Sequence, residues 1–419
     1  MAEYYTGAPA TRNDGQGEAH FTAALLQATL TARKVTAMVS LAWDGPQVWA
    51  FSVSLGLGED PEKVERLSGA LAIAAGAESC RVARDRGRLL IEIPKPPEQR
   101  RPLRAGRLDV LDPPAPMAVA LGIATGGRVV WLDLADERTC HVIIGGTTGS
   151  GKTMALHWLL YRLLRQNSAR DLRLLALDPK RGELDMFAHV PHLLHRVVTH
   201  PVEAARVLAW LTTELDRRAE SGRHTPRLMV VIEEVADLLA VNRDLAAPIA
   251  RVAQIGRGLG VHLVVTTQQP GAKSLGDAVA NFPARLLGRV ASATLTYGAA
   301  GRAKTMADQL LGRGDFLLLT AGTVTRLQVP LMSGREYGRL PRVEQVATLE
   351  DELPNLVAWA DRWRDPRGGR GARVLGDEDY ERMERELREG AGVEDLRAEF
   401  GIGYNRARRI RSVWREVQG

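Results

Sequence analysis

The stretch that decides the fold is His141-Val-Ile-Ile-Gly-Gly-Thr-Thr-Gly-Ser-Gly-Lys-Thr153. Its second part, GTTGSGKT at 146–153, fits G-x-x-x-x-G-K-[ST], the pattern of the phosphate-binding loop of nucleotide-binding proteins. The apolar run at 142–144 predicts a buried parallel strand, and 154–164, rich in Leu, Ala and Met without Pro or Gly, predicts a helix. Strand, glycine-rich loop and helix is the context that the motif requires, and it disfavours the alternative of a plain turn before a helix.

The residue types in this loop predict that it binds ATP with Mg²⁺. Glycine adopts left-handed backbone conformations without strain, so a glycine-rich loop can turn its N–H groups toward phosphate oxygens. Lys152 would contact the β- and γ-phosphates, and the Thr153 hydroxyl would bind Mg²⁺. The predicted ATP-binding residues are Gly146, Thr147, Thr148, Gly149, Ser150, Gly151, Lys152 and Thr153.

Composition sets the class of the protein. A chain of 419 residues is too long for one compact core, and 45% hydrophobic with 25% charged residues is typical of soluble globular proteins. Cys80 and Cys140 fit neither a disulfide framework nor a zinc site, which favours a reducing, cytoplasmic setting. No run approaches the ~18 apolar residues of a membrane span, so membrane association is expected only through partners. The net charge of +6 is a mild basic excess whose placement matters more than its size.

The pattern of apolar runs predicts an α/β fold. Between 113 and 340, strands are predicted at 142–144, 173–177, 228–232, 262–266 and 316–320, with helices between them, one of them beginning at Pro201. Such repeated units predict a parallel sheet with helices on both faces and ligands at the carboxyl ends of the strands.

The flanking segments predict further domains. Polar residues 1–30 are expected to be a disordered lead-in, and 31–112 a small α/β domain with paired strands at 35–54, a helix at 64–77 and a strand at 88–93. A linker is expected at 341–376. Three helices in 377–419, with a turn at Gly401-Ile-Gly403 between the last two, predict a helix-turn-helix domain.

An acidic pair follows the predicted strand at 228–232. Glu233 would bind Mg²⁺, directly or through water, and Glu234 would polarise the attacking water. Gln268, after the strand at 262–266, would sense the γ-phosphate or position water. The segment from Asp178 to Lys180 is another polar strand end at the same predicted edge.

The last predicted helix, 404–417, is basic on most of its surface, which favours a recognition helix in the major groove of duplex DNA over a solvated helix that only packs on its own bundle. The predicted DNA contacts there are Arg406, Arg408, Arg409 and Arg411.

Taken together, these segments resemble the FtsK/SpoIIIE family of double-stranded DNA translocases. The resemblance is carried by GTTGSGKT at 146–153, LDPKRGEL at 177–184, VPHLLHRVVT at 190–199, VVIEEVADLL at 230–239, GRGLGVHLVVTTQQP at 256–270, LLGRGDFLL at 310–318 and FGIGYNRARRI at 400–410. Residues 45–93 look like the family's smaller domain, which precedes the motor.

The resemblance implies a RecA-like P-loop motor that assembles as a homo-hexameric ring around double-stranded DNA, with ATP bound between subunits. Arg257 matches the position of the family's arginine finger. The candidate duplex contacts of the pore region are Lys273, Arg285, Arg289, Arg302 and Lys304. Contacts of this kind touch phosphates and carry no sequence information.

The chain departs from the family pattern in three places. Glu233-Glu234 stands where the family has Asp-Glu, Gln268-Gln269-Pro270 stands where it has Gln-Arg-Pro, and the chain ends without a β-hairpin wing after the last helix. With no membrane span in the sequence, a translocase of DNA transfer, conjugation or plasmid mobilisation is favoured over the full-length septal protein. The alternatives are an ATP-switched DNA-binding regulator and a packaging or single-strand DNA motor.

Overall fold

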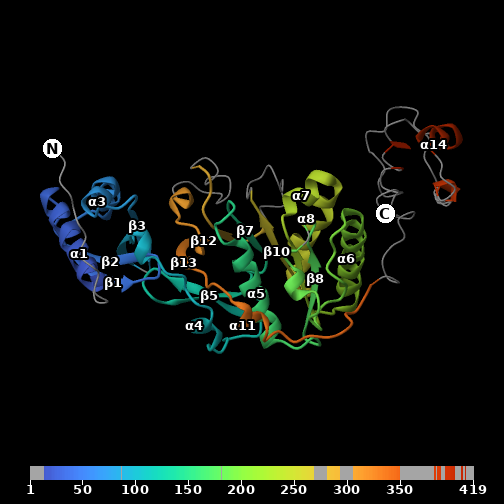
Figure 1. Ribbon diagram of the computed structural model, residues 1–419, viewed down its shortest axis with the longest axis horizontal. Helices are drawn as coiled ribbons and strands as arrows, with labels where there is room; N and C mark the ends of the chain where they lie inside the picture. Colours follow the sequence, from blue (N-terminus) through green and yellow to red (C-terminus); the bar gives the residue numbers. More distant parts are fainter. Residues whose placement is uncertain are drawn as a thin grey trace. The chain divides into compact units, whose positions relative to one another are not determined.

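The computed structural model describes residues 14–85, 87–180, 182–268, 281–292, 305–349, 382–383, 385–387, 392–401, 407–408 and 411 (Figure 1). The chain forms two compact units. The first comprises Met1–Ser168 and Val264–Pro341, and the second Ala169–Leu263 and Arg342–Gly419.

The first unit contains a four-stranded antiparallel sheet, here called the N-terminal sheet, with strand order β1-β2-β4-β3. The predicted strands at 35–54 and 88–93 are confirmed, and a strand that the sequence did not reveal, β3, pairs with β4. The bounds are β1 (Ala37–Asp44), β2 (Val48–Leu55), β3 (Arg81–Asp85) and β4 (Arg88–Pro94).

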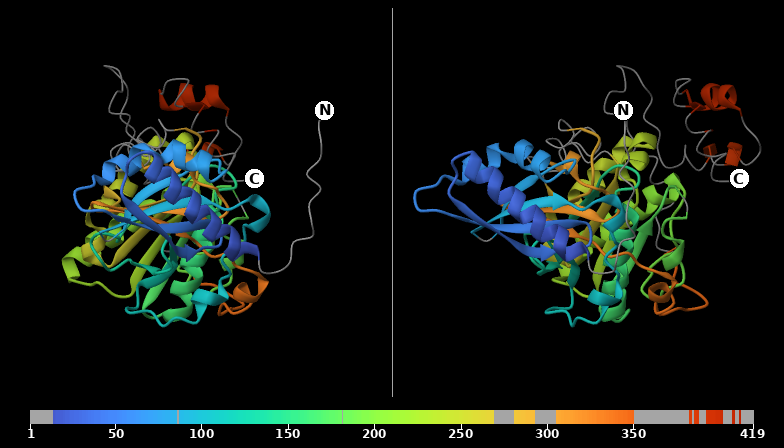
Figure 2. Two further views of the ribbon diagram at one scale, coloured as in Figure 1. Left: turned by 90° about the vertical axis from the view of Figure 1, so that its left-hand side faces the viewer. Right: turned by 60° about the vertical axis from the view of Figure 1, so that its left-hand side comes forward.

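A helix, α1 (Asp14–Ala32), shows that the expected disordered lead-in over 1–30 is wrong from Asp14 onward, while residues 1–13 lie outside the described residues. Ala19, Ala23, Leu26 and Leu30 recur every three or four residues and are buried in one core with the N-terminal sheet. Figure 2 shows α1 crossing the face of these strands. Polar residues near its start, such as the exposed Glu18 and His20, concealed the helix in the sequence.

The helix predicted at 64–77 is two helices, α2 (Pro61–Arg66) and α3 (Ser68–Ala74). Leu67 separates them with φ −89° and ψ 4°, outside the helical region. The Asp60 side chain caps the start of α2 by accepting from Glu62 N at 2.9 Å. Two short helical turns follow the sheet, η1 (Pro97–Gln99) and α4 (Gly106–Asp109).

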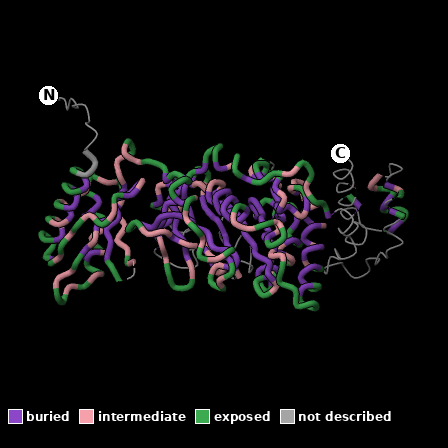
Figure 3. The backbone as a smooth tube through the Cα atoms, turned by 90° about the horizontal axis from the view of Figure 1, so that it is seen from below, coloured by how far each residue is buried: buried purple, intermediate pink, exposed green. Residues whose placement is uncertain are grey.

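A larger sheet has nine strands in the order β6-β5-β13-β12-β11-β7-β10-β9-β8. All five strands predicted between 113 and 340 are confirmed, and Figure 3 shows the sheet as largely buried backbone. The bounds are β5 (Ala118–Ala124), β6 (Val129–Asp133), β7 (Val142–Gly145), β8 (Leu172–Leu177), β9 (Arg227–Ile232), β10 (Val261–Thr267), β11 (Ala284–Leu287), β12 (Asp315–Thr320) and β13 (Thr323–Gln328).

The prediction of a parallel sheet is wrong for part of this sheet. β7 runs parallel to β10 and β11, and β8 parallel to β9, but β12, β13, β5 and β6 form antiparallel pairs. The reason is the length of the connections: only two residues join β12 to β13, and so short a link closes only an antiparallel pair. The fold is therefore mixed α/β.

The predicted helix after the glycine-rich loop is confirmed as α5 (Lys152–Gln166), whose residues 155–164 are all buried. Two of its buried side chains make hydrogen bonds to backbone carbonyls outside the helix. Trp158 Nε1 donates to Ala120 O at 2.8 Å, and Arg162 Nη1 donates to Asp109 O at 2.6 Å. These bonds fix the helix that begins at the phosphate-binding loop.

The predicted helix from Pro201 is α6 (Pro201–Ser221), with Ala204, Leu208, Leu211 and Leu215 buried as expected. No described helix has the length and apolar character to span a membrane. The remaining bounds are η2 (Asp185–Phe187), α7 (Val235–Val241), η3 (Arg243–Leu245), α8 (Ala246–Ile255), η4 (Gly256–Leu259), η6 (Ala307–Gln309), α11 (Gly334–Tyr337) and α14 (Val393–Phe400).

In the C-terminal segment, α14 is the middle of the three predicted helices. It ends at Phe400 and is capped by Gly401, whose left-handed φ of 62° is typical of the residue after a helix. The predicted helices at 377–388 and 404–417 lie mostly outside the described residues, so the helix-turn-helix arrangement stays a prediction.

Candidate nucleotide-binding site

The phosphate-binding loop, 146–153, connects β7 to α5. Gly146, Gly149 and Gly151 have φ values of 148°, 76° and 104°, in the region that side-chain-bearing residues rarely adopt. Gly151 caps α5, so that the first turn of the helix and its unsatisfied N–H groups follow the loop directly.

Backbone bonds hold the loop against the ends of two neighbouring strands. Gly146 N donates to Thr267 O of β10 at 3.3 Å. On the other side, Thr147 donates to Arg289 O from both its backbone N, at 2.8 Å, and its hydroxyl, at 3.1 Å. Within the loop, Ser150 N donates to Thr147 O at 3.1 Å. The loop is therefore fixed at both edges of β7.

The loop fits a phosphate group. Within the described part of the chain, the N–H groups of Thr148, Gly149 and Gly151 donate to no backbone carbonyl. A Cβ on Gly151 would lie 2.8 Å from Gly314 N, so only glycine fits this curve. Donors at the start of a helix, on a concave glycine-rich backbone, form an anion-binding site.

Lys152 lies at the mouth of the loop. Its side chain is 9% exposed, and Nζ donates to Gly146 O at 2.6 Å and to Thr147 O at 3.4 Å. The ammonium group is thus placed over the loop, where a bound phosphate would need a positive charge. Thr153, in the first turn of α5, is half-buried.

The predicted acidic pair follows β9 in the second unit. Glu233 and Glu234 are 4% and 3% exposed. Glu234 has a left-handed backbone, φ 47° and ψ 61°, and caps α7. A buried, strained carboxylate at a strand end is costly to fold, and such residues cluster at functional sites.

Lys180 is a charged neighbour of Glu234. Its Nζ lies 3.5 Å from Glu234 Oε2 and 3.2 Å from Asp237 Oδ2. Burial lowers the pKa of Lys180, but the hydrogen bonds and charges of Asp237 and Glu234 outweigh burial and raise its pKa above the ordinary value. The lysine therefore remains a cation beside the carboxylate.

Asp178 is the polar strand end of β8, level with the end of β9 because Leu177 pairs with Ile232. Its side chain is fully buried; Oδ2 accepts from Leu184 N at 3.1 Å, and Oδ1 accepts no hydrogen bond from the described residues. The expectation that these two strands end at the same edge is confirmed.

The other predicted catalytic residues are exposed. Arg257 lies in η4, and Gln268 directly follows β10. Of the predicted pore-region contacts, Arg285 is half-buried in β11, where burial lowers its pKa, and Arg289 is exposed just beyond that strand. Lys273, Arg302 and Lys304 lie outside the described residues.

The predicted C-terminal contacts are described only in part. Arg408 is exposed and Arg411 half-exposed, both with helical backbone, while Arg406 and Arg409 lie outside the described residues. Their roles stay predictions.

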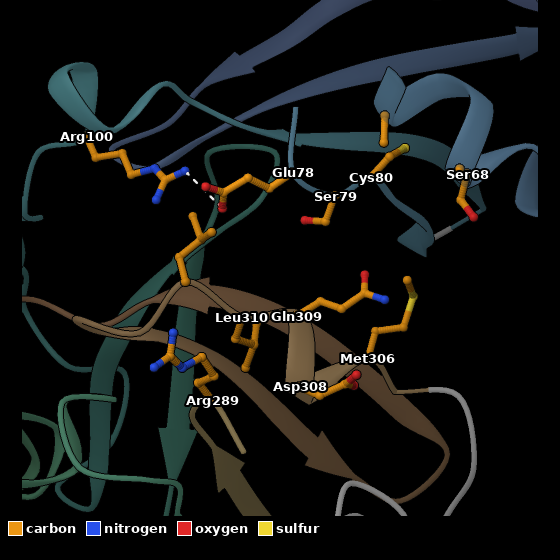
Figure 4. A pocket seen from close by; sticks show the side chains of 13 residues that line it. Ser68, Glu78, Ser79, Cys80, Arg100, Arg289, Met306, Asp308, Gln309 and Leu310 are labelled. Carbon is orange, nitrogen blue, oxygen red and sulfur yellow. Dashed lines mark ion pairs between the residues drawn. The ribbon is translucent and has the colours of Figure 1, made fainter. Parts of the chain in front are cut away.

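A cavity of about 460 Å³ lies next to the loop's anchor. Figure 4 shows Arg289 on one side of the cavity and Arg100 with Glu78 on the opposite side. Arg100 Nη2 lies 4.0 Å from Glu78 Oε2. Cys80 lines the cavity, and burial followed by the charge of Glu92 raises the pKa of its thiol to about 12. The thiol is protonated at neutral pH and is no nucleophile.

One part of the site was missed from the sequence. The segment 311–315 packs against the phosphate-binding loop, with Arg313 N donating to Gly149 O at 3.0 Å and Gly314 N to Ser150 O at 2.9 Å. The glycines on either side of Arg313 were the available signal, because two closely spaced glycines between helical and strand patterns indicate close backbone approach.

Comparison with known proteins identifies the family. The FtsK/SpoIIIE family matches residues 107–225, and the FtsK alpha domain matches residues 6–96. The DNA translocase SftA of Bacillus subtilis is 30% identical over 425 residues, covering 92% of this chain and 43% of the relative. The DNA translocase FtsK of Caulobacter vibrioides is 29% identical over 449 residues, covering 92% and 54%. The chain thus spans about half the length of these relatives.

Two solved structures share the fold. The pCW3 conjugation coupling protein TcpA, in its monomer form with ATPγS, has a TM-score of 0.51 at 19% identity, covering 75% of this chain and 96% of TcpA. The cytoplasmic domain of the type VII secretion ATPase EccC of Thermomonospora curvata has a TM-score of 0.50 at 23% identity, covering 56% of this chain and 32% of EccC. The matched family models and the aligned relatives show that the chain belongs to the FtsK/SpoIIIE family.

Proposed function

We propose that this chain is an ATPase that moves double-stranded DNA through a ring of its own copies. The observation that carries the proposal is the loop at 146–153, in a chain of this family. It has three left-handed glycines, backbone N–H groups that no described carbonyl accepts, and a buried lysine at the start of a helix. Relatives named DNA translocases, aligned over 92% of the chain, support DNA as the substrate of the motion.

Two carboxylates would provide the chemistry of hydrolysis. The Thr153 hydroxyl and the Glu233 carboxylate are oxygen donors of the kind that Mg²⁺ prefers. Bound Mg²⁺ would neutralise charge on the transferred phosphoryl group. Glu234 would accept a proton from the attacking water, and Gln268 would orient that water. Lys180 Nζ lies 3.5 Å from Glu234 Oε2 and so places a positive charge beside the proposed base.

Arg257 would act on a neighbouring subunit. Its exposure on η4 leaves it accessible to a partner, as an arginine finger supplied in trans must be. This role is the reason for proposing a RecA-like motor in a homo-hexameric ring, because each ATP site is then completed by the adjacent copy.

Duplex DNA would pass through the ring on basic side chains. Of the two described candidates in the pore region, Arg289 is exposed and Arg285 half-buried, so Arg289 is the more accessible to DNA. Lys273, Arg285, Arg302 and Lys304 are proposed to share this role, and the C-terminal arginines 406, 408, 409 and 411 to contact DNA from a helix-turn-helix domain. Contacts to phosphate would let the motor move on any sequence.

The test is ATP hydrolysis with and without long duplex DNA, combined with displacement of a triplex-forming strand from that duplex. We expect duplex DNA to stimulate hydrolysis strongly and the triplex strand to be displaced. Lys152→Ala should lower hydrolysis about 100-fold or more, because it removes the charge that stabilises the phosphates. Lys34→Ala, an exposed lysine of the N-terminal segment, is the matched control.

The alternatives make different predictions. A DNA-binding regulator switched by ATP would bind duplex DNA but displace no triplex strand, and a single-strand motor would be stimulated by single-stranded DNA instead. Full activity in Lys152→Ala would place the nucleotide site elsewhere.

A further inference from the structure

The segment 311–315, here called the bracing loop, supports the phosphate-binding loop from behind. Gly312, Arg313 and Gly314 all have left-handed φ values, 75°, 51° and 92°, and this turns the N–H groups of Arg313 and Gly314 toward the carbonyls of Gly149 and Ser150. A Cβ on Gly312 would lie 3.1 Å from Gly149 O, so the two backbones are in direct contact.

The other side of the bracing loop is held by the N-terminal segment. Gln47, in the turn between β1 and β2, is 6% exposed. Its Nε2 donates to Arg313 O at 3.0 Å and lies 3.5 Å from Gly312 O. Gln328 of β13 donates to the same Arg313 carbonyl at 2.9 Å. One peptide unit therefore separates Gln47 from the phosphate-binding loop.

A buried ionic chain holds the end of the bracing loop. Asp315 Oδ2 accepts from Leu311 N at 2.9 Å and from Arg326 Nη2 at 2.7 Å. Arg326 Nη1 in turn donates to Glu92 of β4 at 3.0 Å. The side chains of Asp315, Arg326 and Glu92 are 4%, 4% and 1% exposed. Both ends of the loop are thus tied to the N-terminal sheet.

We propose that Gln47 is a positioning residue for nucleotide binding: through the bracing loop, the N-terminal sheet fixes the backbone that holds the phosphates, and nucleotide binding in turn stabilises the N-terminal sheet. The inference rests on the proposed ATP site. The coupling must run both ways, because an element that changes the affinity for a ligand is itself stabilised by that ligand to the same extent. If Gln47 only packed against the bracing loop, its side-chain amide would have no effect on the affinity for the nucleotide.

Substitution of Gln47 distinguishes a positioning role in nucleotide binding from a role in packing alone. Gln47→Glu keeps the shape of the side chain but replaces the donating amide with an oxygen that faces two carbonyls. Gln47→Ala removes the hydrogen bond without repulsion. Gln99→Ala is the control, because the Gln99 amide bonds only to Glu18 within the N-terminal segment, among the contacts described. Thermal unfolding of each variant checks that the chain is folded.

The affinity of the full chain for ATPγS with Mg²⁺ is measured first. Gln47→Ala should weaken it about fivefold, the loss of one hydrogen bond, and Gln47→Glu by more, while Gln99→Ala leaves it unchanged. Amide hydrogen exchange is measured next. ATPγS should slow exchange at 44–53 and 88–94 in the parent chain, and this protection should be reduced in Gln47→Glu.

Two results would overturn the inference while leaving the ATP site standing: Gln47→Glu binding ATPγS as tightly as the parent, or exchange in the N-terminal sheet unchanged by ATPγS that is bound. If the parent chain binds no ATPγS, the proposed function fails and the inference fails with it.

Discussion

Two glycines of the phosphate-binding loop differ in what surrounds them. Both are left-handed, but among the described residues no heavy atom beyond its chain neighbours lies within 4 Å of where a Cβ on Gly149 would be, whereas a Cβ on Gly151 would lie 2.8 Å from Gly314 N. The first position therefore requires only a backbone conformation, and the second also requires space against the bracing loop.

Gly149→Ala should therefore destabilise the chain by about 1 kcal/mol, the cost of a left-handed alanine. Gly151→Ala adds a clash with backbone and should cost about 2–4 kcal/mol and weaken ATPγS binding. Urea unfolding of both variants measures the difference. An equal loss of unfolding free energy in Gly149→Ala and Gly151→Ala would mean that the bracing loop shifts to make room for the added Cβ at no cost.

Among the elements, β4, β12 and β13 share a buried ionic chain of Glu92, Arg326 and Asp315, which Arg81 and Thr125 extend by bonds to Glu92 at 3.0 Å and 2.6 Å. Burial acts to lower the pKa of Arg326, but Asp315 and Glu92 outweigh burial and raise it. The chain of charges is costly to bury and is stable only while every member is present.

Arg326→Met should cost about 3–5 kcal/mol, because it removes the cation that Asp315 and Glu92 share and leaves Glu92 with Arg81 alone. The control is Arg84→Ala, whose pair with Glu65 at 2.9 Å is 57% exposed on the arginine side and should be worth less than about 1 kcal/mol. Chemical denaturation compares them. Similar losses in the free energy of unfolding for the two variants would show that water reaches Glu92, Arg326 and Asp315.

The same chain predicts acid sensitivity. Burial acts to raise the pKa of Glu92, but Arg81, Arg326 and the Thr125 hydroxyl together hold it below the ordinary 4.5. The unfolded chain then takes up a proton at higher pH than the folded one, so the stabilisation is complete above pH 4.5 and is lost as pH falls below it. Urea midpoints at about pH 6 and about pH 3.5 should differ less in Glu92→Gln than in the parent. An equal shift in both would contradict the assignment.

Prediction of elements from the sequence succeeded where an apolar run ends at a clear signal. β7, β8, β9 and β10 are runs of Val, Ile and Leu, and α5 has strong helix formers throughout. β5, with three alanines and a glycine in seven residues, has no such signal, since its strand character comes from burial by neighbours. β3 and β11 are short and carry arginines.

The parts of the candidate site that are local motifs were predictable from the sequence, and its long-range contacts were not. The loop and the acidic pair are local motifs, and they were found. The contact of Gly149 with Arg313 joins residues far apart in the chain, and the Gln47 bond joins residues further apart still. Only the fold brings these residues together, so the glycines beside Arg313 could indicate a close backbone approach but not which backbone is approached.

For the whole molecule, the proposal requires that neighbouring copies share each ATP site. Arg257→Ala and Lys152→Ala should each be inactive alone, because one lacks the finger and the other the phosphate-binding charge. When the two variants are mixed before assembly, a Lys152→Ala subunit can supply its intact Arg257 to a neighbour with an intact loop. DNA-stimulated hydrolysis should then partly recover.

The controls are preparations of each single variant at the same total protein concentration, assembled in the same way. If the mixed preparation stays inactive although electron microscopy shows mixed rings, Arg257 does not act in trans. Rings of another size than six would change the assembly but leave the sharing of sites intact.

The left-handed backbone of Glu234 has a consequence for how such a motor can evolve. Glycine would adopt φ 47° without strain, so selection for thermal stability alone favours replacing Glu234 by glycine. Selection for ATP hydrolysis favours keeping the carboxylate. Libraries of this chain screened only for heat resistance should therefore accumulate replacements at position 234 and lose hydrolysis, whereas selection for motion along DNA should retain the glutamate despite its cost.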